Sequence, residues 1–297
     1  MRSIIVTALA AALVACTSGG TKPGDTCSSK APCSGGQVCD LTNPGGAVCL
    51  DSAGDVDGDG IPNGKDFCNH LAGGAFDEDG DGFGDECDAC PTSKPPTKPD
   101  ADGDMVDSPC DPDSTTAGDK IAVFNGFNTA LPTGWTASAG WKVTGGEAVM
   151  TPTNPATVEQ LTVHLAVPST HVSILAAYRV DSVAATAAMS DAGVIGQNVL
   201  PQGTTIVSCG ANRATGDALR LVTNAGSNLK QAMNLFDPAG VYRLAQQLDG
   251  ATVNCALVGD HETAADQASS NGDSMSEVGL YARGATVRFQ YLLVIQR

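Results

Sequence analysis

The chain has little positive charge and few aromatic side chains. Its 297 residues carry 16 Lys and Arg against 33 Asp and Glu, which gives a net charge of −17, and aromatic residues make up 4% of the sequence. No basic patch is available to neutralise phosphates, which argues against nucleic acid as a partner. No apolar run reaches the roughly 20 residues that a membrane-spanning helix needs.

Catalytic motifs are also lacking. The sequence has no Gly-x-Ser-x-Gly elbow, no His-Glu-x-x-His helix and no Glu-x-Asp-x-x-Glu strand. We interpret the one dense polar cluster after residue 119, at 260–262, as a solvated loop. The glutamates of this part of the chain are isolated from one another, at Glu147, Glu159, Glu262 and Glu277. We therefore expect that the chain is not an enzyme.

Aspartate, by contrast, is concentrated between residues 51 and 113, where 16 Asp and 2 Glu face 3 Lys. Three stretches begin Asp-x-Asp-x-Asp, at Asp55, Asp77 and Asp100, so the pattern recurs every 22 or 23 residues. Each stretch has another Asp at its twelfth position. A solvated acidic linker is the alternative interpretation, but such linkers do not repeat Asp at fixed offsets.

This spacing fits calcium, which takes about six to eight oxygen ligands from positions 1, 3, 5, 7, 9 and 12 of a loop with Gly at position 6. The third stretch departs from the pattern, with Met105 at position 6 and Ser108 at position 9. The predicted Ca²⁺ ligands are Asp55, Asp57, Asp59, the carbonyl of Ile61, Asn63 and Asp66 in the first loop, Asp77, Asp79, Asp81, the carbonyl of Phe83, Asp85 and Asp88 in the second, and Asp100, Asp102, Asp104 and Asp111 in the third.

The acidic segment has few apolar side chains, and its charges repel one another. Chain entropy and charge repulsion therefore oppose its compaction. We expect the segment to be disordered when calcium is chelated, so that calcium binding supplies its folding free energy.

With its cysteines, the segment 55–113 resembles thrombospondin type 3 repeats, whose pattern is D-x-D-x-D-G-x-x-D-x-x-D-x-C-P. It departs from the pattern at Asn63 and at Asn69, which follows Cys68 in place of Pro. The resemblance implies a calcium-wrapped stalk with little regular secondary structure. EF-hands and dockerins are alternatives, but they need helices beside their loops. The resemblance also implies that neighbouring repeats are joined by disulfides Cys68–Cys87 and Cys90–Cys110.

The start of the chain is typical of an export signal. Residues 1–16 combine one positive charge with an apolar run of about a dozen residues. The ending Leu-Val-Ala-Cys16 resembles a bacterial lipobox, which implies a diacylglycerol on Cys16 and anchoring to a membrane, with 17–26 as a tether. Thr17 after the cysteine points to the outer membrane by the rule known from enteric bacteria. An ordinary signal peptide followed by a free cysteine is the alternative.

Cysteine usage supports an exported protein of the bacterial cell envelope. Without Cys16, the 11 cysteines leave an even number, as disulfides require. Residues 25–50 are too few to build a core, so disulfides must hold them. Zinc is the alternative, but no C-x-x-C knuckle is present. The four cysteines of this module, among which three pairings are open, are Cys27, Cys33, Cys39 and Cys49.

After a boundary at 114–119, residues 119–297 have the composition of an all-β domain. Asp249-Gly250 between two alternating runs predicts a hairpin. Residues 181–191 fit one short helix or a loop. Many short antiparallel strands indicate a sandwich, and the size suits a jelly roll. The candidate strands are 120–127, 141–151, 157–167, 171–181, 192–200, 204–210, 218–223, 229–236, 240–248, 251–258, 277–282 and 285–295.

Three short stretches resemble concanavalin A-like, laminin-G-like sandwiches. They are Phe127 to Trp135, the strand that starts at Trp141, and the run 278–291, which in that family forms a late pair of strands that closes the sheet. We expect both tryptophans to pack in the core rather than to stack on a sugar. Cys209 and Cys255 lie in different candidate strands, and we expect them to pair across the sandwich.

Together these features predict a mainly β protein: a disulfide module, irregular calcium-wrapped repeats and an antiparallel β-sandwich. The predicted function is that of a calcium-binding, lipid-anchored cell-surface protein whose sandwich binds a glycan or a partner protein in adhesion. A purely structural envelope component and a carbohydrate-active enzyme with an unrecognised pair of carboxylates remain the alternatives.

Overall fold

The computed structural model describes residues 21–28, 30–94, 100–200, 203–214, 216–232, 234–238, 240–259 and 262–297. The predicted signal segment and Cys16 lie outside the described residues. The chain divides into two units, Met1–Ala75 and Phe76–Arg297. Within the described ranges the regular elements are strands, and no helix there is long and apolar enough to cross a membrane.

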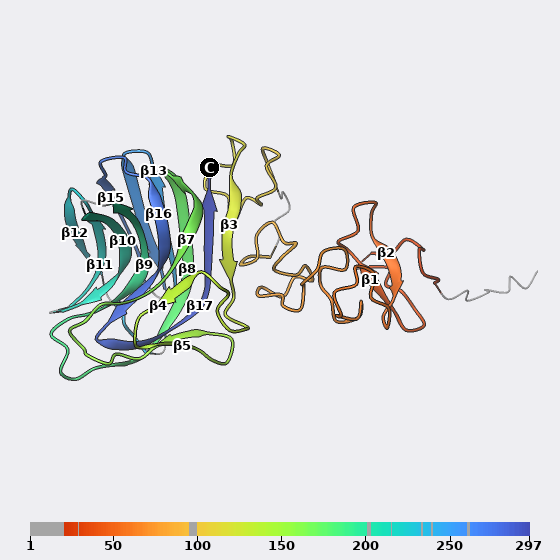
Figure 1. Cartoon of the computed structure of the whole chain (residues 1–297), viewed down its shortest axis with the longest axis horizontal. Helices are drawn as coiled ribbons and strands as arrows, with labels where there is room; N and C mark the ends of the chain where they lie inside the picture. Colours follow the sequence, from red (N-terminus) through yellow and green to blue (C-terminus); the bar gives the residue numbers. More distant parts are fainter. Residues whose placement is uncertain are drawn as a thin grey trace, which may run out of the picture. The chain divides into compact units, whose positions relative to one another are not determined.

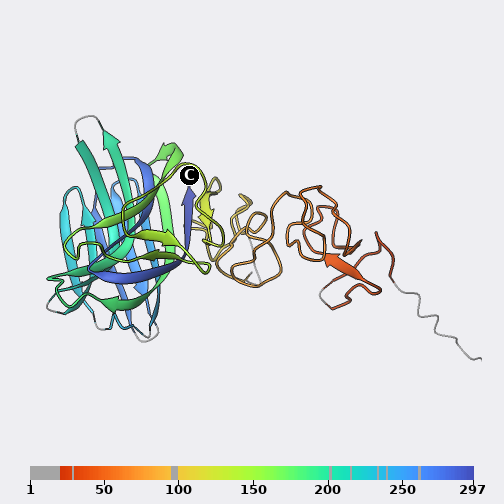
Figure 2. The same ribbon diagram turned by 60° about the horizontal axis from the view of Figure 1, so that its bottom comes forward.

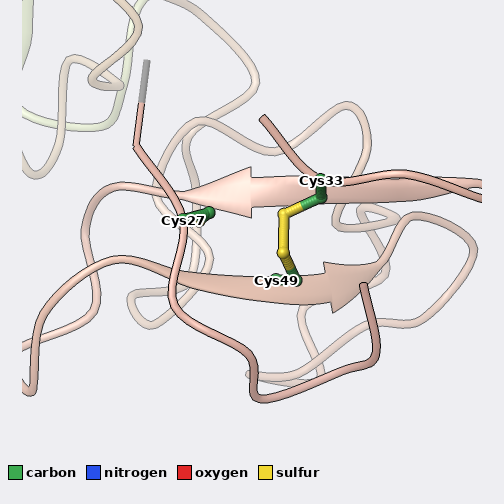
Figure 3. Close-up of side chains that lie close together, drawn as sticks. All are labelled: Cys27, Cys33 and Cys49. Atoms are coloured by element: carbon green, nitrogen blue, oxygen red, sulfur yellow. A yellow bond between two sulfur atoms is a disulfide. The ribbon is translucent and has the colours of Figure 1, made fainter. Parts of the chain in front are cut away.

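The first unit is held by disulfides around one small hairpin. Strands β1 (Gln37–Asp40) and β2 (Val48–Asp51) pair antiparallel, with Cys39 opposite Cys49. The two bonds that the sequence left open are Cys27–Cys39 and Cys33–Cys49. Figure 3 shows the second bond, with Cys27 beside it. All four thiols are thus oxidised, and none is available as a zinc ligand.

The second unit is a sandwich of two antiparallel sheets, as the sequence predicts (Figure 1). In the described residues, the 7-stranded sheet has the order β12 (Gly226–Gln231), β11 (Asp217–Thr223), β10 (Gly203–Arg213), β9 (Ser190–Leu200), β16 (Met275–Arg283), β7 (Glu159–Ser169) and β4 (Trp135–Ala137). The 8-stranded sheet has the order β15 (Thr263–Ser269), β14 (Thr252–Val258), β13 (Val241–Asp249), β8 (His171–Val183), β17 (Ala285–Gln296), β6 (Ala148–Met150) and β5 (Trp141–Val143), with β3 (Lys120–Asn125) also paired to β17.

The core lies between the two sheets, because alternate side chains of each strand point inward. Tyr178 stacks on Tyr242, with 5.2 Å between ring centroids. Trp135 packs against Phe127, and Trp141 packs against Phe289, so both tryptophans belong to the core, as we expected from the sequence.

One disulfide crosses the sandwich. Cys209 on β10 is bonded to Cys255 on β14, so the bond joins the 7-stranded sheet to the 8-stranded sheet. Both residues are buried. This is the pairing that the sequence predicts for these two cysteines.

Several strands differ from the sequence-based assignment. The single strand expected at 141–151 is a hairpin of β5 and β6, because Gly145 and Gly146 take the left-handed conformation. Strands β4 and β15 were not predicted. Of the two alternatives for 181–191, a short helix or a loop, the structure has a loop at residues 184–189 between β8 and β9. Strands β16 and β17 do not pair with each other, because each lies inside a different sheet.

The division between the two units falls between Ala75 and Phe76, inside the acidic segment. The physical reason is a second apolar cluster on the outer face of the 8-stranded sheet. There Cys90, Val106 and Cys110 pack against side chains of β8 and β17. Figure 2 shows the yellow loops of this segment beside the end of β17. The second and third acidic loops therefore belong to the sandwich unit. The side chains they contact are Ala177, Tyr291, Leu293 and Ile295.

Candidate metal centres

The three acidic loops share one pattern of backbone hydrogen bonds. In each loop, the carboxylate at position 1 accepts hydrogen bonds from the backbone N–H groups of positions 4 and 6, which closes the chain into a tight turn. The donors are Gly58 and Gly60 on Asp55 at 2.8 and 3.0 Å, Gly80 and Gly82 on Asp77 at 2.7 and 2.9 Å, and Gly103 and Met105 on Asp100 at 2.7 and 2.9 Å.

Position 6 is left-handed in all three loops. The φ angles are 95° at Gly60, 100° at Gly82 and 75° at Met105. Glycine adopts this region without steric cost, whereas the side chain of Met105 makes the same conformation unfavourable. The third loop therefore keeps the shape of the others despite its unusual residue.

The carboxylates at positions 1, 3 and 5 converge in every loop. In each set, one oxygen per residue lies within 4.8 Å of the others, which is close enough for a shared cation. Among the described residues, no lysine or arginine forms an ion pair with these nine aspartates. The sets are Asp55, Asp57 and Asp59; Asp77, Asp79 and Asp81; and Asp100, Asp102 and Asp104.

The aspartate at position 12 lies near each set. Its Oδ1 accepts a hydrogen bond from the backbone N–H two residues later, at 2.7 Å for Asp66 and 2.8 Å for both Asp88 and Asp111. The like charges that act on Asp66 include those of Asp57 and Asp59, besides Asp40, and those that act on Asp111 include those of Asp102 and Asp104, besides Asp113. Position 12 is therefore close enough to positions 3 and 5 to feel their charges.

Buried carboxylate oxygens in these loops have no hydrogen-bond partner in the described structure. A buried charge without a partner is costly, and cation ligation removes that cost. An all-oxygen donor set of this kind suits calcium. The unpartnered atoms are Oδ2 of Asp57, Asp66, Asp79, Asp81 and Asp111, and both carboxylate oxygens of Asp102. The predicted ligands thus fit the predicted ion.

Burial and mutual repulsion also change the proton affinity of the second loop. Burial, reinforced by the charges of Asp81 and Asp79, raises the pKa of Asp88 to about 7. Burial, reinforced by Glu86 and Asp77, raises the pKa of Asp85 to about 6. Protons and a cation therefore compete for these carboxylates near neutral pH.

Asp107 lies one residue before position 9 in the third loop. The carboxylate of Asp107 accepts the N–H of Asp100, the residue at position 1, at 3.0 Å. In the first two loops the position-9 residues Asn63 and Asp85 accept the N–H of the residue at position 2, at 3.0 and 2.8 Å. Asp107 therefore makes a related contact one residue earlier, although Asp111 keeps its offset, and an assignment by fixed offsets did not include it.

The position-7 residues contribute their N–H groups to the turn. Ile61 donates to Asp59 at 2.6 Å, and Phe83 donates to Asp81 at 2.8 Å. Ligation by the carbonyls of these two residues stays a prediction.

Cys90 and Cys110 form a disulfide, as the resemblance implies. Cys68 and Cys87 are also disulfide-bonded.

A groove of about 600 Å³ lies where the third loop meets the outer face of the 8-stranded sheet. Residues 109–112 form one wall, and strands β8, β13, β14 and β15 form the floor. Gln247 in the floor donates to the carbonyl of Pro112 at 3.4 Å. The hydroxyl, amide and carboxylate side chains that line the groove are Ser173, Gln247, Asn254, Gln267, Asp111 and Asp266.

A buried carboxylate lies on the outer face of the other sheet. Glu277 on β16 accepts hydrogen bonds from Thr162 Oγ1 at 2.5 Å and from Gln197 Nε2 at 2.7 Å, and it is 8% exposed. Glu277 is isolated from the other glutamates in the sequence, and no described residue pairs a second carboxylate with it. Asp191 on the same face is ion-paired with Arg283.

The remaining glutamates are held by other contacts. Glu147 is ion-paired with Arg179 and Arg288, each at 3.1 Å, and Asp181 is ion-paired with the same two arginines. Glu159 accepts a hydrogen bond from Thr153 at 3.2 Å. Residues 260 and 261 lie outside the described ranges, so only Glu262 of that cluster is described, and it lines an open pocket with Arg213 and Asp217.

Comparisons with known proteins show likeness in fold alone. No protein-family model and no curated protein matches the chain. Among solved structures, a Bacillus licheniformis β-glucanase is 11% identical with a TM-score of 0.44, covering 61% of this chain and 100% of its own. Winged bean acidic lectin complexed with methyl-α-D-galactose is 11% identical with a TM-score of 0.44, covering 60% and 98%.

A GH43 protein from Bacillus licheniformis is 13% identical with a TM-score of 0.43, and the match covers 59% of this chain and 39% of that one. The fold of the second unit is a β-sandwich, and these structures are similar to it in fold. The expectation that the chain is not an enzyme is corrected here, because several of the structures that are similar to it in fold are glycoside hydrolases.

Proposed function

We propose that the chain is an exported calcium-binding protein whose β-sandwich binds carbohydrate. The observation that carries the proposal is the set of buried carboxylate oxygens, convergent and without partners, in three loops of one geometry. Positions 1, 3, 5 and 12 of each loop hold the ion, together with Asn63, Asp85 or Asp107. Anchoring through a lipid on Cys16 and a place in the bacterial cell envelope are part of the same proposal.

Calcium suits these loops better than other common divalent ions. The donors are carboxylate and amide oxygens, with no histidine and no free thiol among them, which disfavours zinc and copper. Magnesium keeps several of its waters and demands near-octahedral geometry, whereas calcium accepts many carboxylates in an irregular loop. The ion supplies charge neutralisation, and the backbone N–H groups supply the orientation of the ligands.

The position of the loops connects calcium to the sandwich. The second and third loops belong to the same unit as the sheets, and their disulfide Cys90–Cys110 packs on the outer face of the 8-stranded sheet. Asn128 of the sandwich hydrogen-bonds to Glu78 of the second loop. Calcium that orders these loops therefore also completes the surface of the sandwich.

The groove beside the third loop supports carbohydrate as the ligand class. Sugars present many neutral hydroxyls that both donate and accept, and amide side chains such as Gln247, Asn254 and Gln267 match them in both roles. Leu175 and the proline rings of 109 and 112 offer apolar surface to the C–H faces of a sugar ring.

Calorimetric titration of the metal-free chain tests the calcium proposal. We expect saturable binding of calcium by residues 17–297, with one ion fewer when Asp57, Asp79 or Asp102 is replaced by Asn. Asp51→Asn is the matched control, because Asp51 lies in the same segment but outside the loops. Wild-type protein that takes up no calcium would overturn the proposal.

A second candidate function is a carbohydrate-active enzyme. Glu277 favours it, because a buried carboxylate held by two hydrogen bonds on a sheet face is a candidate acid or base. The test is release of reducing ends from β-glucan and xylan. Hydrolysis that Glu277→Gln abolishes and Glu262→Gln leaves intact supports an enzyme. Absence of hydrolysis by the calcium-loaded wild type leaves binding as the function.

A further inference from the structure

Asp119 is a buried carboxylate beside the third acidic loop that no part of the loop pattern includes. It is the last residue before β3 and is 4% exposed, and its Oδ2 has no hydrogen-bond partner among the described residues. Its backbone N–H donates to Oδ2 of Asp104 at 2.7 Å, next to the N–H of Gly118 at 3.0 Å. Asp119 is therefore attached to position 5 of the loop.

The surroundings of Asp119 are acidic. The carboxylates of Asp104, Asp111 and Asp113 act on it, and Arg297 is the cation whose charge opposes them. Arg297 is occupied elsewhere, because its Nη1 lies 2.9 Å from Asp113 and donates to the carbonyl of Thr116 at 3.2 Å. No ion pair joins Arg297 to Asp119 in the described structure.

The first loop has a corresponding backbone contact. In that loop the N–H of Gly73 donates to Asp59 at 2.7 Å, as the N–H of Gly118 donates to Asp104. The next residue in the first loop is Gly74, whereas the third loop has Asp119 at this place. The charges of Asp111 and Asp104 act on the carboxylate of Asp119, so the third loop has one more carboxylate near its position-12 residue than the first.

We propose that Asp119 is a further ligand of the cation in the third loop, so that this metal site is shared between the loop and the sandwich. The proposal rests on calcium binding by the acidic loops, as proposed above. A cation neutralises the group of Asp104, Asp111 and Asp119, whereas a water molecule in the adjacent 110 Å³ cavity supplies hydrogen bonds but no charge.

In a shared site, the calcium ion joins the third loop to the edge of the sandwich. Residues 118 and 119 lead directly into β3, which pairs with β17 from Leu292 to Gln296. The residue after β17, Arg297, returns to Asp113. A cation at this point therefore fixes the first and the last strand of the sandwich together with the third loop.

The test is calcium titration of the chain carrying Asp119→Asn, which keeps the shape of the side chain and removes its charge. We expect one of the bound ions to bind at least tenfold more weakly, while the others are unchanged. Asp249→Asn, which lines the same cavity, is the matched control and should bind like the wild type. Equal affinity of all sites in the Asp119 variant would overturn the inference and leave the proposed function intact. A wild type that binds no calcium would instead overturn the proposed function.

Hydrogen exchange on the unmodified chain provides a second test that needs no variant. We expect the backbone amides of β3, Lys120–Asn125, to exchange at least tenfold more slowly with calcium than with chelator. Calcium that protects the loops but leaves the exchange of β3 unchanged would contradict a shared site.

Discussion

Cys90 and Cys110 form a disulfide that packs on the outer face of the 8-stranded sheet, beside Tyr291 and Leu293. The bond closes the chain around the third acidic loop, with a sequence separation of 20 residues. It also places the loop against the sandwich, so that one covalent link serves both the metal site and the apolar contact.

Removal of this disulfide should weaken the sandwich unit. The double change of Cys90 and Cys110 to Ser releases a loop whose closure is worth about 3 kcal/mol in the unfolded-chain model, and it removes two buried sulfurs from the outer cluster. Urea unfolding at saturating calcium measures the loss. An unfolding free energy within about 0.5 kcal/mol of the wild type would contradict the docking described here.

Met105 should be replaceable by glycine with a gain in stability. Its φ of 75° is unfavourable for a side chain, and it is 80% exposed, so no packing is lost. We expect Met105→Gly to raise the calcium-loaded unfolding free energy by about 0.5 to 1 kcal/mol. Met105→Leu, which keeps the strain, should leave it unchanged. A loss of stability in the glycine variant would show that the left-handed turn is not formed.

The dependence of stability on pH should have opposite signs with and without calcium. The pKa of Asp88 is raised to about 7 and that of Asp85 to about 6, chiefly by burial, so a metal-free chain whose second loop stays folded holds these protons more tightly than the unfolded chain, whereas disorder of the loop without calcium removes the effect. Without calcium, stability should therefore fall as the pH rises from about 4 to about 7.

With calcium bound, the same carboxylates must be ionised, and stability should rise over that pH range. Thermal unfolding in calcium and in chelator, from pH 4 to pH 8, measures both trends. Replacement of Asp88 by Asn should flatten the metal-free curve. Parallel curves in the two conditions would contradict a role for these groups in metal binding.

The groove can be tested through its amide side chains. Gln247→Ala and Asn254→Ala should each weaken the binding of a soluble neutral polysaccharide about five- to tenfold, since each removes hydrogen bonds worth about 1 kcal/mol. Affinity electrophoresis against a panel of polysaccharides measures the change. Gln160→Ala, on the outer face of the opposite sheet, is the control. If the polysaccharide retards all three variants equally in the gel, the carbohydrate site does not lie in this groove.

Much of the strand arrangement was predictable, because the alternation of apolar and polar residues and the turn residues are local features of the sequence. The hairpin at Asp249-Gly250 follows from its turn chemistry and is present as β13 and β14. Strand β4 was missed because three residues are too few to show an alternation of apolar and polar side chains. Strand β15 was missed because Thr263–Ser269 is too polar to show that alternation. Their pairing is decided by neighbours distant in sequence.

The metal loops were predictable at positions set by fixed offsets and not elsewhere. Asp55 to Asp88 follow a rigid spacing that the sequence displays directly. Asp107 lies one residue before the offset of position 9, and Asp119 lies outside the repeat, so only the folded chain brings it to the third loop. The packing of Val106 on the sandwich also depends on tertiary contacts, which is why the unit boundary falls before the second loop.

Calcium in the acidic loops can be located by crystallography. A crystal structure of the chain grown in calcium, with anomalous diffraction data, gives the position of each ion. We expect a peak in each loop within about 2.3 to 2.6 Å of oxygens of the aspartates at positions 1, 3 and 5, with Asp119 close to the third. Ordered loops without peaks, in crystals grown in millimolar calcium, would contradict calcium binding by these loops.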